Sequence, residues 1–243
     1  KAIDLAQIIS DKTFKINSID KTNPRLDFNK VVHIKEKSVG LDHDTFLIAE
    51  IGLNHNGSMV MAKKLIDEAI DAGADAVKLQ SYKTKYRVAK HGKTSRYVEK
   101  VLGVEETDYE MLKKYELTKE QTKELFDYAK DRTIIFSAPF DMESADELAE
   151  LGVDCYKIAS FDLVNLPLIR KVAAQQKPMI ISTGMSYLSE VEDALMEVAK
   201  CGNPNLILMQ CTSSYPCPPE TMNIKAIDKS TAAVLRRNPN VLV

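Results

Sequence analysis

Six short apolar segments that alternate with helical segments constrain this chain more than any other feature of its sequence. We predict these segments to be strands over residues 46–49, 74–79, 133–137, 155–159, 179–183 and 206–211. Capping signals mark three of the expected helix starts: Thr118-x-x-Gln121, Ser189-x-x-Glu192, and Asn165 ahead of Leu166-Pro167. Strand, helix and strand in repetition is typical of a parallel sheet in an α/β protein.

Polar or ionisable side chains stand at or just past the ends of these strands. They are Glu50, Lys78, Gln80, Ser160, Asp162, Thr183 and Tyr215. In a parallel barrel the carboxyl ends of all strands open on one face, whereas an open parallel sheet gathers them at one crevice. The placement therefore predicts a single active site.

The predicted fold is a (β/α)8 barrel of the TIM type, apparently truncated after about six βα units. Residues 240–243 have the pattern of the start of a seventh strand, so we expect either a fragment of a barrel or an open sheet. Residues 1–40 form an N-terminal extension in which 31–37 is expected to be a strand that closes the barrel's N-terminal end. Residues 41–243 are the expected catalytic domain, with a charged, weakly periodic loop over 81–115 as a candidate substrate lid.

Composition and charge limit the partners. The chain is 44% hydrophobic with a formal charge of −2 and no apolar run near the roughly 20 residues of a membrane span. This balance favours a small-molecule substrate over nucleic acid or a membrane surface. The four cysteines have no CxxC spacing, which is typical of reduced thiols in a cytoplasmic protein.

Two lysines interrupt otherwise apolar strands. Lys78 and Lys157 each stand in a segment suited to burial, where an unpaired ammonium is costly. An ion pair with Glu50 or Asp162 is the structural alternative for either lysine. An anionic ligand, such as phosphate or carboxylate, accounts better for both together.

The run from Glu50 to Gly57 joins a carboxylate, an imidazole, two amides and two glycines in one turn. Glu50 faces the lysines and is a candidate for proton transfer, with an ion pair as the alternative. For His55 we expect a surface position.

At the exit of the fourth strand, Ser160 could donate to a phosphate and Asp162 could accept from sugar hydroxyls. A cap on the following helix is the alternative for Asp162.

Six motifs in this order and spacing resemble the sialic acid synthase family. They are FLIAEIGLNHNG at 46–57, GADAVKLQ at 73–80, FSAPFD at 136–141, YKIASFDLVNLPLI at 156–169, KPMIISTGM at 177–185 and QCTSSYP at 210–216. The resemblance implies a cytoplasmic, homodimeric synthase that condenses phosphoenolpyruvate with an N-acetylmannosamine-type sugar and water. It covers about residues 40–243.

The resemblance also implies roles for single residues. Lys78, Lys157 and Ser160 match residues that hold phosphoenolpyruvate, Glu50 matches an acid/base glutamate, and Tyr215 matches a sugar-contacting tyrosine. Together with Gln80 and Ser213 as substrate-binding residues and Asp162 as a catalytic one, they complete the candidate site.

Three positions depart from the family's pattern. Asp162 stands where many members carry Glu, Ala138 where some carry Thr, and Ser213 where some carry Asn. The resemblance points to an N-acetylneuraminate synthase that uses N-acetylmannosamine or its 6-phosphate. Because of the departure at Asp162, a pseudaminic or legionaminic acid synthase that uses a diacetamido sugar remains an alternative.

The resemblance implies a divalent metal, Mn²⁺ or Mg²⁺, but no metal ligand is assigned in this chain. The family's metal-binding histidines lie beyond Val243, and the four histidines present lack ligand spacing. A related synthase that uses an aldose phosphate and a non-catalytic barrel remnant remain as alternatives.

Overall fold

The computed structural model describes residues 28–90, 107–214 and 216–227. Its main feature is a six-stranded parallel sheet. The strands are β3 (Ile48–Gly52), β4 (Ala76–Ser81), β5 (Ile134–Pro139), β6 (Tyr156–Ile158), β7 (Met179–Ser182) and β8 (Leu206–Met209). Two further short strands, β1 (Val32–Ile34) and β2 (Lys37–Val39), form a separate antiparallel hairpin.

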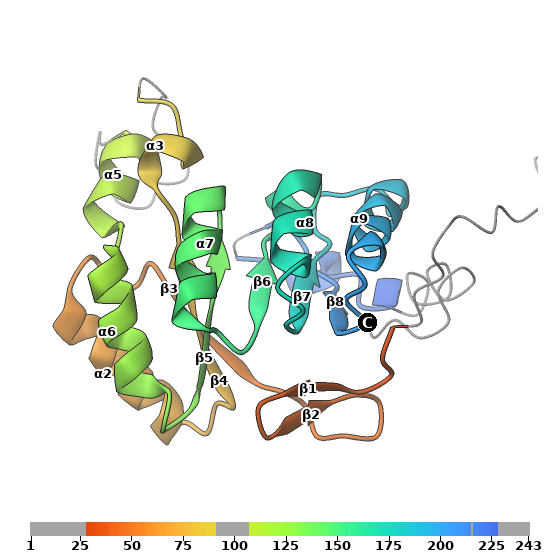
Figure 1. Cartoon of the computed structure of the whole chain (residues 1–243), viewed down its shortest axis with the longest axis horizontal. Helices are drawn as coiled ribbons and strands as arrows, with labels where there is room; N and C mark the ends of the chain where they lie inside the picture. Colours follow the sequence, from red (N-terminus) through yellow and green to blue (C-terminus); the bar gives the residue numbers. More distant parts are fainter. Residues whose placement is uncertain (1–27, 91–106, 215, 228–243) are drawn as a thin grey trace, which may run out of the picture.

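Helices connect the strands. They are α2 (Met59–Asp71), α3 (Thr84–Arg87), α5 (Asp108–Tyr115), α6 (Lys119–Ala129), α7 (Met142–Leu151), α8 (Leu166–Ala173) and α9 (Leu188–Lys200), with 3-10 turns η1 (Ser160–Asp162) and η2 (Pro219–Thr221). The strand order β3-β4-β5-β6-β7-β8 follows the sequence. Right-handed crossovers in one constant direction place α2, α6, α7, α8 and α9 on the same face of the sheet, as in a barrel and unlike a doubly wound sheet. Figure 1 shows α6, α7, α8 and α9 following one another around the outside of the strands. The predicted barrel class, with about six βα units, is confirmed.

Side-chain alternation divides the core into two parts. On the outer face of the sheet, strand residues such as Val77 and Ile158 pack with helix residues such as Ile66, Leu125 and Leu195. The inner face carries a smaller apolar cluster near the beginnings of the strands, made of Ala76, Ile134, Phe136, Cys155, Ile180 and Ile207. Residues two apart in a strand share a face, so the residue two positions after each of these strand residues also points inward.

The hairpin β1–β2 contributes apolar side chains to this inner cluster at the amino-terminal ends of the strands. Val32 and Ile34 are fully buried against it, and Figure 1 shows the hairpin at the end of the sheet opposite α3 and α5. The single strand expected over 31–37 is therefore wrong in detail. Lys35 turns the chain with a φ of 50°, and Lys37 begins a second strand.

Capping and ion pairs order the helical layer. Thr118 and Asn165 accept hydrogen bonds from the backbone at the starts of α6 and α8, as predicted. The predicted Ser189 cap is wrong, because α9 begins two residues earlier, after Tyr187, whose N–H donates to Glu190.

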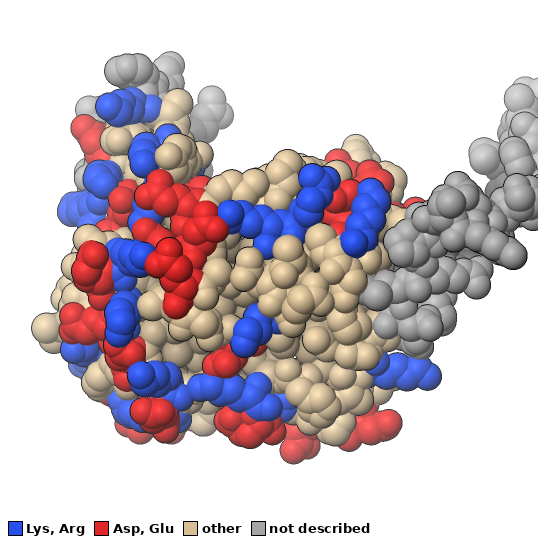
Figure 2. All heavy atoms as spheres, in the orientation of Figure 1, with Lys and Arg blue, Asp and Glu red and all other residues tan. Residues whose placement is uncertain are grey.

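Neighbouring helices are bridged by ion pairs. These are Lys63–Glu124, Lys119–Glu150, Lys171–Asp146 and Arg170–Glu197. Figure 2 accordingly shows both signs of charge over α5, α6 and α7 on the face in view. The exposed pairs among them contribute little each, whereas the Glu197 carboxylate is buried.

The loop after β4 carries α3 and α5, with residues 91–106 outside the described part of the chain. Of the helices in the described residues, none is both long and apolar enough to cross a bilayer. Residues 240–243 and the expected seventh strand also lie outside the described residues.

Candidate active site

A polar layer lies on the inner face of the sheet, directly above the apolar cluster. Lys78 in β4, Lys157 in β6 and Ser182 in β7 each follow a residue of that cluster by two positions: Ala76, Cys155 and Ile180. The alternation of strand side chains thus aims all three polar groups into the same space. The apolar layer beneath them separates this space from the hairpin.

Glu50 and Lys78 form an ion pair across the first two strands of the sheet. They are directly opposite each other in the parallel register of β3 and β4. The ion pair with Glu50, which was the alternative to an anionic ligand for Lys78, is therefore present in this structure. The Glu50 side chain is nonetheless 47% exposed, against 12% for Lys78, so this carboxylate is open to a ligand.

Lys157 has a different environment. Its side chain is buried, and its ammonium donates to the Ser182 hydroxyl and, at 2.7 Å, to the Ile158 carbonyl. Within the part of the chain that the structure describes, no carboxylate forms an ion pair with Lys157. Burial, together with the positive charge of Lys78, lowers the pKa of Lys157 to about 8. Among the described residues, the site thus holds a buried lysine that has no carboxylate in direct contact.

Ser182 also belongs to this layer; its run with Thr183 and Gly184 offers hydroxyl donors, but it was not placed among the predicted substrate-binding residues. Its hydroxyl accepts from Lys157, and the Cys211 thiol donates to it at 3.3 Å. The alternation of β7 was a signal that could have found it, because Ser182 occupies the inward position at the carboxyl end of a strand.

Two predicted serines converge around a glycine. The Gly184 N–H donates to the Ser160 hydroxyl at 3.2 Å. A Cβ atom added at Gly184 would lie 2.9 Å from the Ser160 oxygen and 2.7 Å from the Ser213 oxygen. Hydroxyls from the loops after β6 and β8 are thus brought together beside the loop after β7.

Gln80 connects Glu50 to the outer part of the site. A Cβ atom added at Gly52 would lie 2.8 Å from a Glu50 carboxylate oxygen and 3.3 Å from the Gln80 amide nitrogen. The Gln80 oxygen accepts from Arg87 at 3.3 Å. Arg87 comes from the charged loop after β4, and the weak periodicity of that loop gave no signal for it.

Asp162 is 6% exposed, and one of its carboxylate oxygens is buried without a hydrogen-bond partner among the described residues. The other oxygen accepts from the Asn165 amide at 3.3 Å. Burial raises the pKa of Asp162 to about 6, although the Asn165 amide and the Arg87 charge act in the opposite direction. The cap of α8 is Asn165, so Asp162 does not have the capping role that was the alternative for it.

The expectation for His55 is wrong. Its side chain is fully buried, Nδ1 accepts from the Gly57 N–H at 3.0 Å, and Nε2 has no partner among the described residues. Burial lowers the pKa of the imidazole. Ala138 lies in a small apolar cluster with Tyr82 and Phe140. Tyr215 lies outside the described residues.

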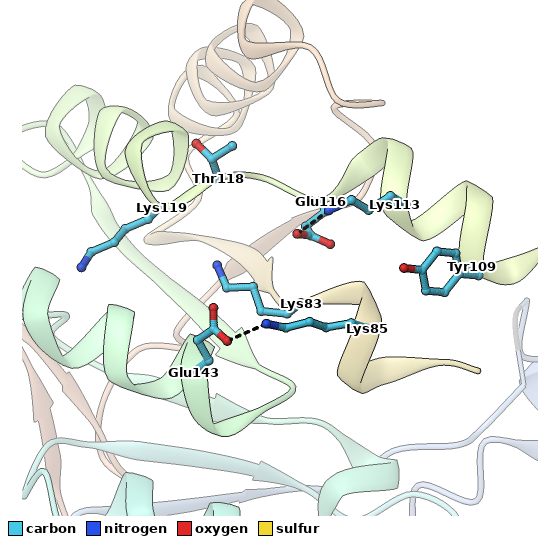
Figure 3. A pocket seen from close by; sticks show the side chains of 8 residues that line it. All are labelled: Lys83, Lys85, Tyr109, Lys113, Glu116, Thr118, Lys119 and Glu143. Carbon is cyan, nitrogen blue, oxygen red and sulfur yellow. Dashed lines mark hydrogen bonds and ion pairs between the residues drawn. The ribbon is translucent and has the colours of Figure 1, made fainter. Parts of the chain in front are cut away.

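A separate lysine-lined pocket of about 340 Å³ lies beside the site, between the loop after β4 and the starts of α6 and α7 (Figure 3). Its cations are already paired: Lys83 with Glu147, Lys85 with Glu143, Lys113 with Glu116 and Lys119 with Glu150. This pocket is therefore a weaker anion site than Lys157, which has no such partner.

The divalent metal implied by the resemblance finds no ligand set in residues 28–90, 107–214 and 216–227. Across those ranges, no three His, Cys, Asp or Glu side chains come together in a way that could hold a metal ion.

Comparison with known proteins agrees with the fold. The model of the NeuB family matches residues 65–234. The chain belongs to the NeuB family. It is 44% identical over 186 residues to the N,N'-diacetyllegionaminic acid synthase of Campylobacter jejuni, covering 75% of this chain and 56% of that protein. It is 35% identical over 192 residues to the N-acetylneuraminate-9-phosphate synthase of Mus musculus, covering 79% and 53%.

Among solved structures, the N-acetylneuraminic acid synthetase of Leptospira borgpetersenii, in complex with citrate, superposes with a TM-score of 0.71 at 30% identity. The match covers 83% of this chain and 66% of that one. The chain thus spans about half the length of the curated relatives it matches.

Proposed function

We propose that this chain is the barrel part of a nonulosonic acid synthase, which condenses phosphoenolpyruvate with an N-acetylmannosamine-type sugar and water. The observation that supports this most directly is Lys157, a buried ammonium with no carboxylate partner among the described residues. Membership of the NeuB family supports the same reaction.

Lys157 and Lys78 are proposed to bind the phosphate and carboxylate of phosphoenolpyruvate. The mutual repulsion that contributes to the low pKa of Lys157 is relieved when an anion lies between the two ammonium groups. Ser182 would then hold the Lys157 ammonium in place, and the hydroxyls of Ser160 and Ser213 would donate to the anion.

In the reaction, the methylene carbon of phosphoenolpyruvate forms a bond to the aldehyde carbon of the open-chain sugar. A water oxygen bonds to the carbon that bears the phosphate, and the bond from that carbon to the phosphate oxygen breaks. Of the two water protons, one ends on the former aldehyde oxygen and the other leaves with inorganic phosphate. The partly exposed Glu50 carboxylate is the proposed carrier of these protons.

Asp162 and Gln80 are proposed to orient the sugar. The unpartnered oxygen of Asp162 is an acceptor for a sugar hydroxyl or N–H, and a bound donor removes the cost of leaving that oxygen unsatisfied. Orientation of this kind brings the aldehyde within reach of phosphoenolpyruvate.

The proposal also concerns which sugar is the substrate. We favour N-acetylmannosamine or its 6-phosphate, and a diacetamido sugar of the legionaminic or pseudaminic type is the alternative. Similarity to a diacetyllegionaminic acid synthase at 44% identity and to an N-acetylneuraminate-9-phosphate synthase at 35% leaves both within the family.

Phosphate release is the test. The full-length protein that contains this chain is incubated with phosphoenolpyruvate and, separately, N-acetylmannosamine, its 6-phosphate, a 2,4-diacetamido sugar or an aldose phosphate. Each reaction is run with Mn²⁺ and with a chelator, because the family resemblance predicts a metal requirement, and light scattering measures whether the protein is the expected homodimer. Release with an acetamido sugar supports the proposal, whereas release with the aldose phosphate alone, or with none of the sugars, contradicts it.

A further inference from the structure

Arg87 is held in the site by aromatic rings. It is the last residue of α3, and its guanidinium carbon lies 4.0 Å from the centre of the Phe140 ring and 4.6 Å from that of Tyr82. The Phe161 ring, stacked on Phe140 with centroids 5.3 Å apart, lies 6.0 Å from the same carbon. Cation–π contacts fix the plane of a guanidinium without using its N–H donors.

Most of those donors remain available. Arg87 donates to the Gln80 oxygen at 3.3 Å, and it has no ion pair with any carboxylate in the described ranges. A guanidinium has five N–H donors in a rigid fork, so a half-buried one with a single weak contact is set up to bind something else.

Asp162 is the complementary group. The charges of Arg87 and Asp162 influence each other, yet the two side chains form no hydrogen bond in the described structure. The Asp162 oxygen without a partner is an acceptor, and the fork of Arg87 is purely a donor. The pair therefore suits a ligand that offers an acceptor to one side and a donor to the other.

A secondary amide has this arrangement. Its carbonyl oxygen and its N–H point in opposite directions, so it can bridge a donor and an acceptor that do not touch. Its methyl group can lie on an aromatic face, and Phe161 is 49% exposed beside the site. A phosphate fits less well, because the carboxylates of Asp162 and Asp141 act on each other here and would both repel a dianion.

We propose that Arg87 is a specificity-determining residue of the sugar site, which donates to the carbonyl oxygen of an acylamino substituent while Asp162 accepts from its N–H or a neighbouring hydroxyl. This inference rests on the proposed function for the identity of the ligand as an acylamino sugar. It adds to that function a reason why the acylamino group is preferred over a hydroxyl.

The test compares sugars that differ by one acetamido group in the full-length protein. The pairs are N-acetylmannosamine against mannose, and a 2,4-diacetamido sugar against its 4-hydroxy analogue. Arg87→Met is expected to raise KM for the acetamido sugar about tenfold to a hundredfold, as for loss of a charged hydrogen bond, and to remove most of the preference over the hydroxyl analogue. KM for phosphoenolpyruvate should stay within about twofold. Arg87→Lys, which keeps the charge without the fork, should fall in between.

Lys85→Met is the matched control. Lys85 lies in the same helix but is exposed and paired with Glu143, so both Michaelis constants should remain unchanged. An unchanged acetamido preference in a folded Arg87→Met variant overturns the inference and leaves the proposed function intact.

Sugar binding, measured by saturation-transfer NMR without phosphoenolpyruvate, separates the remaining outcomes. If the protein releases no phosphate but binds the acetamido sugar over its analogue through Arg87, the proposed reaction fails and the inference stands. If it neither turns over nor binds any of these sugars, both are overturned.

Discussion

Replacement of Asp162 by asparagine is expected to make the protein more stable and less active at the same time. The carboxylate is 6% exposed, one oxygen has no partner among the described residues, and burial raises the pKa from 3.8 to about 6. This rise in the pKa of Asp162 corresponds to about 3 kcal/mol of unfavourable free energy for the ionised carboxylate in the folded state.

Because folding raises the pKa of Asp162, its ionisation destabilises the folded protein only at higher pH. Below about pH 4 the carboxyl is protonated in both the folded and the unfolded chain, so it carries no penalty. The penalty grows as pH rises from about 4 to about 6, because over this range the unfolded chain has ionised the group and the folded chain has not. It is complete above about pH 6, where the folded chain ionises the group as well. An asparagine never ionises, but its amide must also be desolvated, so we expect a gain of about 1–3 kcal/mol above pH 6 and little change near pH 4.

Urea denaturation of both proteins at pH 4 and at pH 7.5 measures this difference, and phosphate release at pH 7.5 measures the loss of activity. The asparagine variant should have a higher midpoint at pH 7.5 only, with a raised KM for the sugar and a nearly unchanged KM for phosphoenolpyruvate. A lower midpoint at both pH values would refute the reasoning, since it would mean that the carboxylate supports the start of α8.

Three further predictions concern the anion site and the backbone. Lys157→Met should weaken phosphoenolpyruvate binding about tenfold to a hundredfold in calorimetry, because it removes a charged hydrogen bond, and sugar binding should change little; equal binding would show that this lysine is structural. In the wild type, the dissociation constant for phosphoenolpyruvate should change little up to about pH 7 and rise from there through pH 8 and above, as Lys157 loses its proton while the ligand phosphate, with a second pKa near 6, keeps its charge; a profile that stays flat to pH 9.5 would exclude this lysine as the source. Gly57→Ala should destabilise the fold by about 1–3 kcal/mol, because φ is +75° and the new Cβ would lie 2.7 Å from the Lys114 carbonyl oxygen, whereas Gly73→Ala, with φ of +81° and open space, should cost less; equal melting temperatures for the two variants would contradict the steric argument.

The order of strands and the face on which the site lies could be predicted because both follow from local patterns. Apolar runs bounded by turn residues gave all six strands of the sheet, and the inward direction of Lys78 and Lys157 follows from a period of two. The helix caps at Thr118 and Asn165 could be predicted for the same reason, since each involves residues only three apart in the sequence.

What could not be predicted depends on contacts that are distant in sequence or that compete locally. The Ser189 cap fits its motif, but Glu190 binds the Tyr187 N–H and starts α9 earlier. His55 has a polar side chain in a Gly-Asn turn, and nothing in that turn reveals that the imidazole becomes fully buried. Arg87 owes its position to Phe140 and Phe161, which follow more than 50 residues later in the sequence.

The hairpin β1–β2 has a consequence for how the protein unfolds. Its neighbour Asn29 donates to Asn205, 176 residues away, and its turn residue Lys35 forms an ion pair with Asp154. Val32 and Ile34 belong to the same buried cluster as inner residues of β4, β5, β7 and β8 and as Cys155, which directly precedes β6. Such contacts can form only after the last of these strands is in place, so the hairpin should dock late in folding and open early in native-state hydrogen exchange. Because one short segment shares a buried cluster with β8, at one end of the sheet, and with β4, next to the strand at the other end, its release should loosen β4 and β8 together, as a single cooperative unit, before the strands between them exchange.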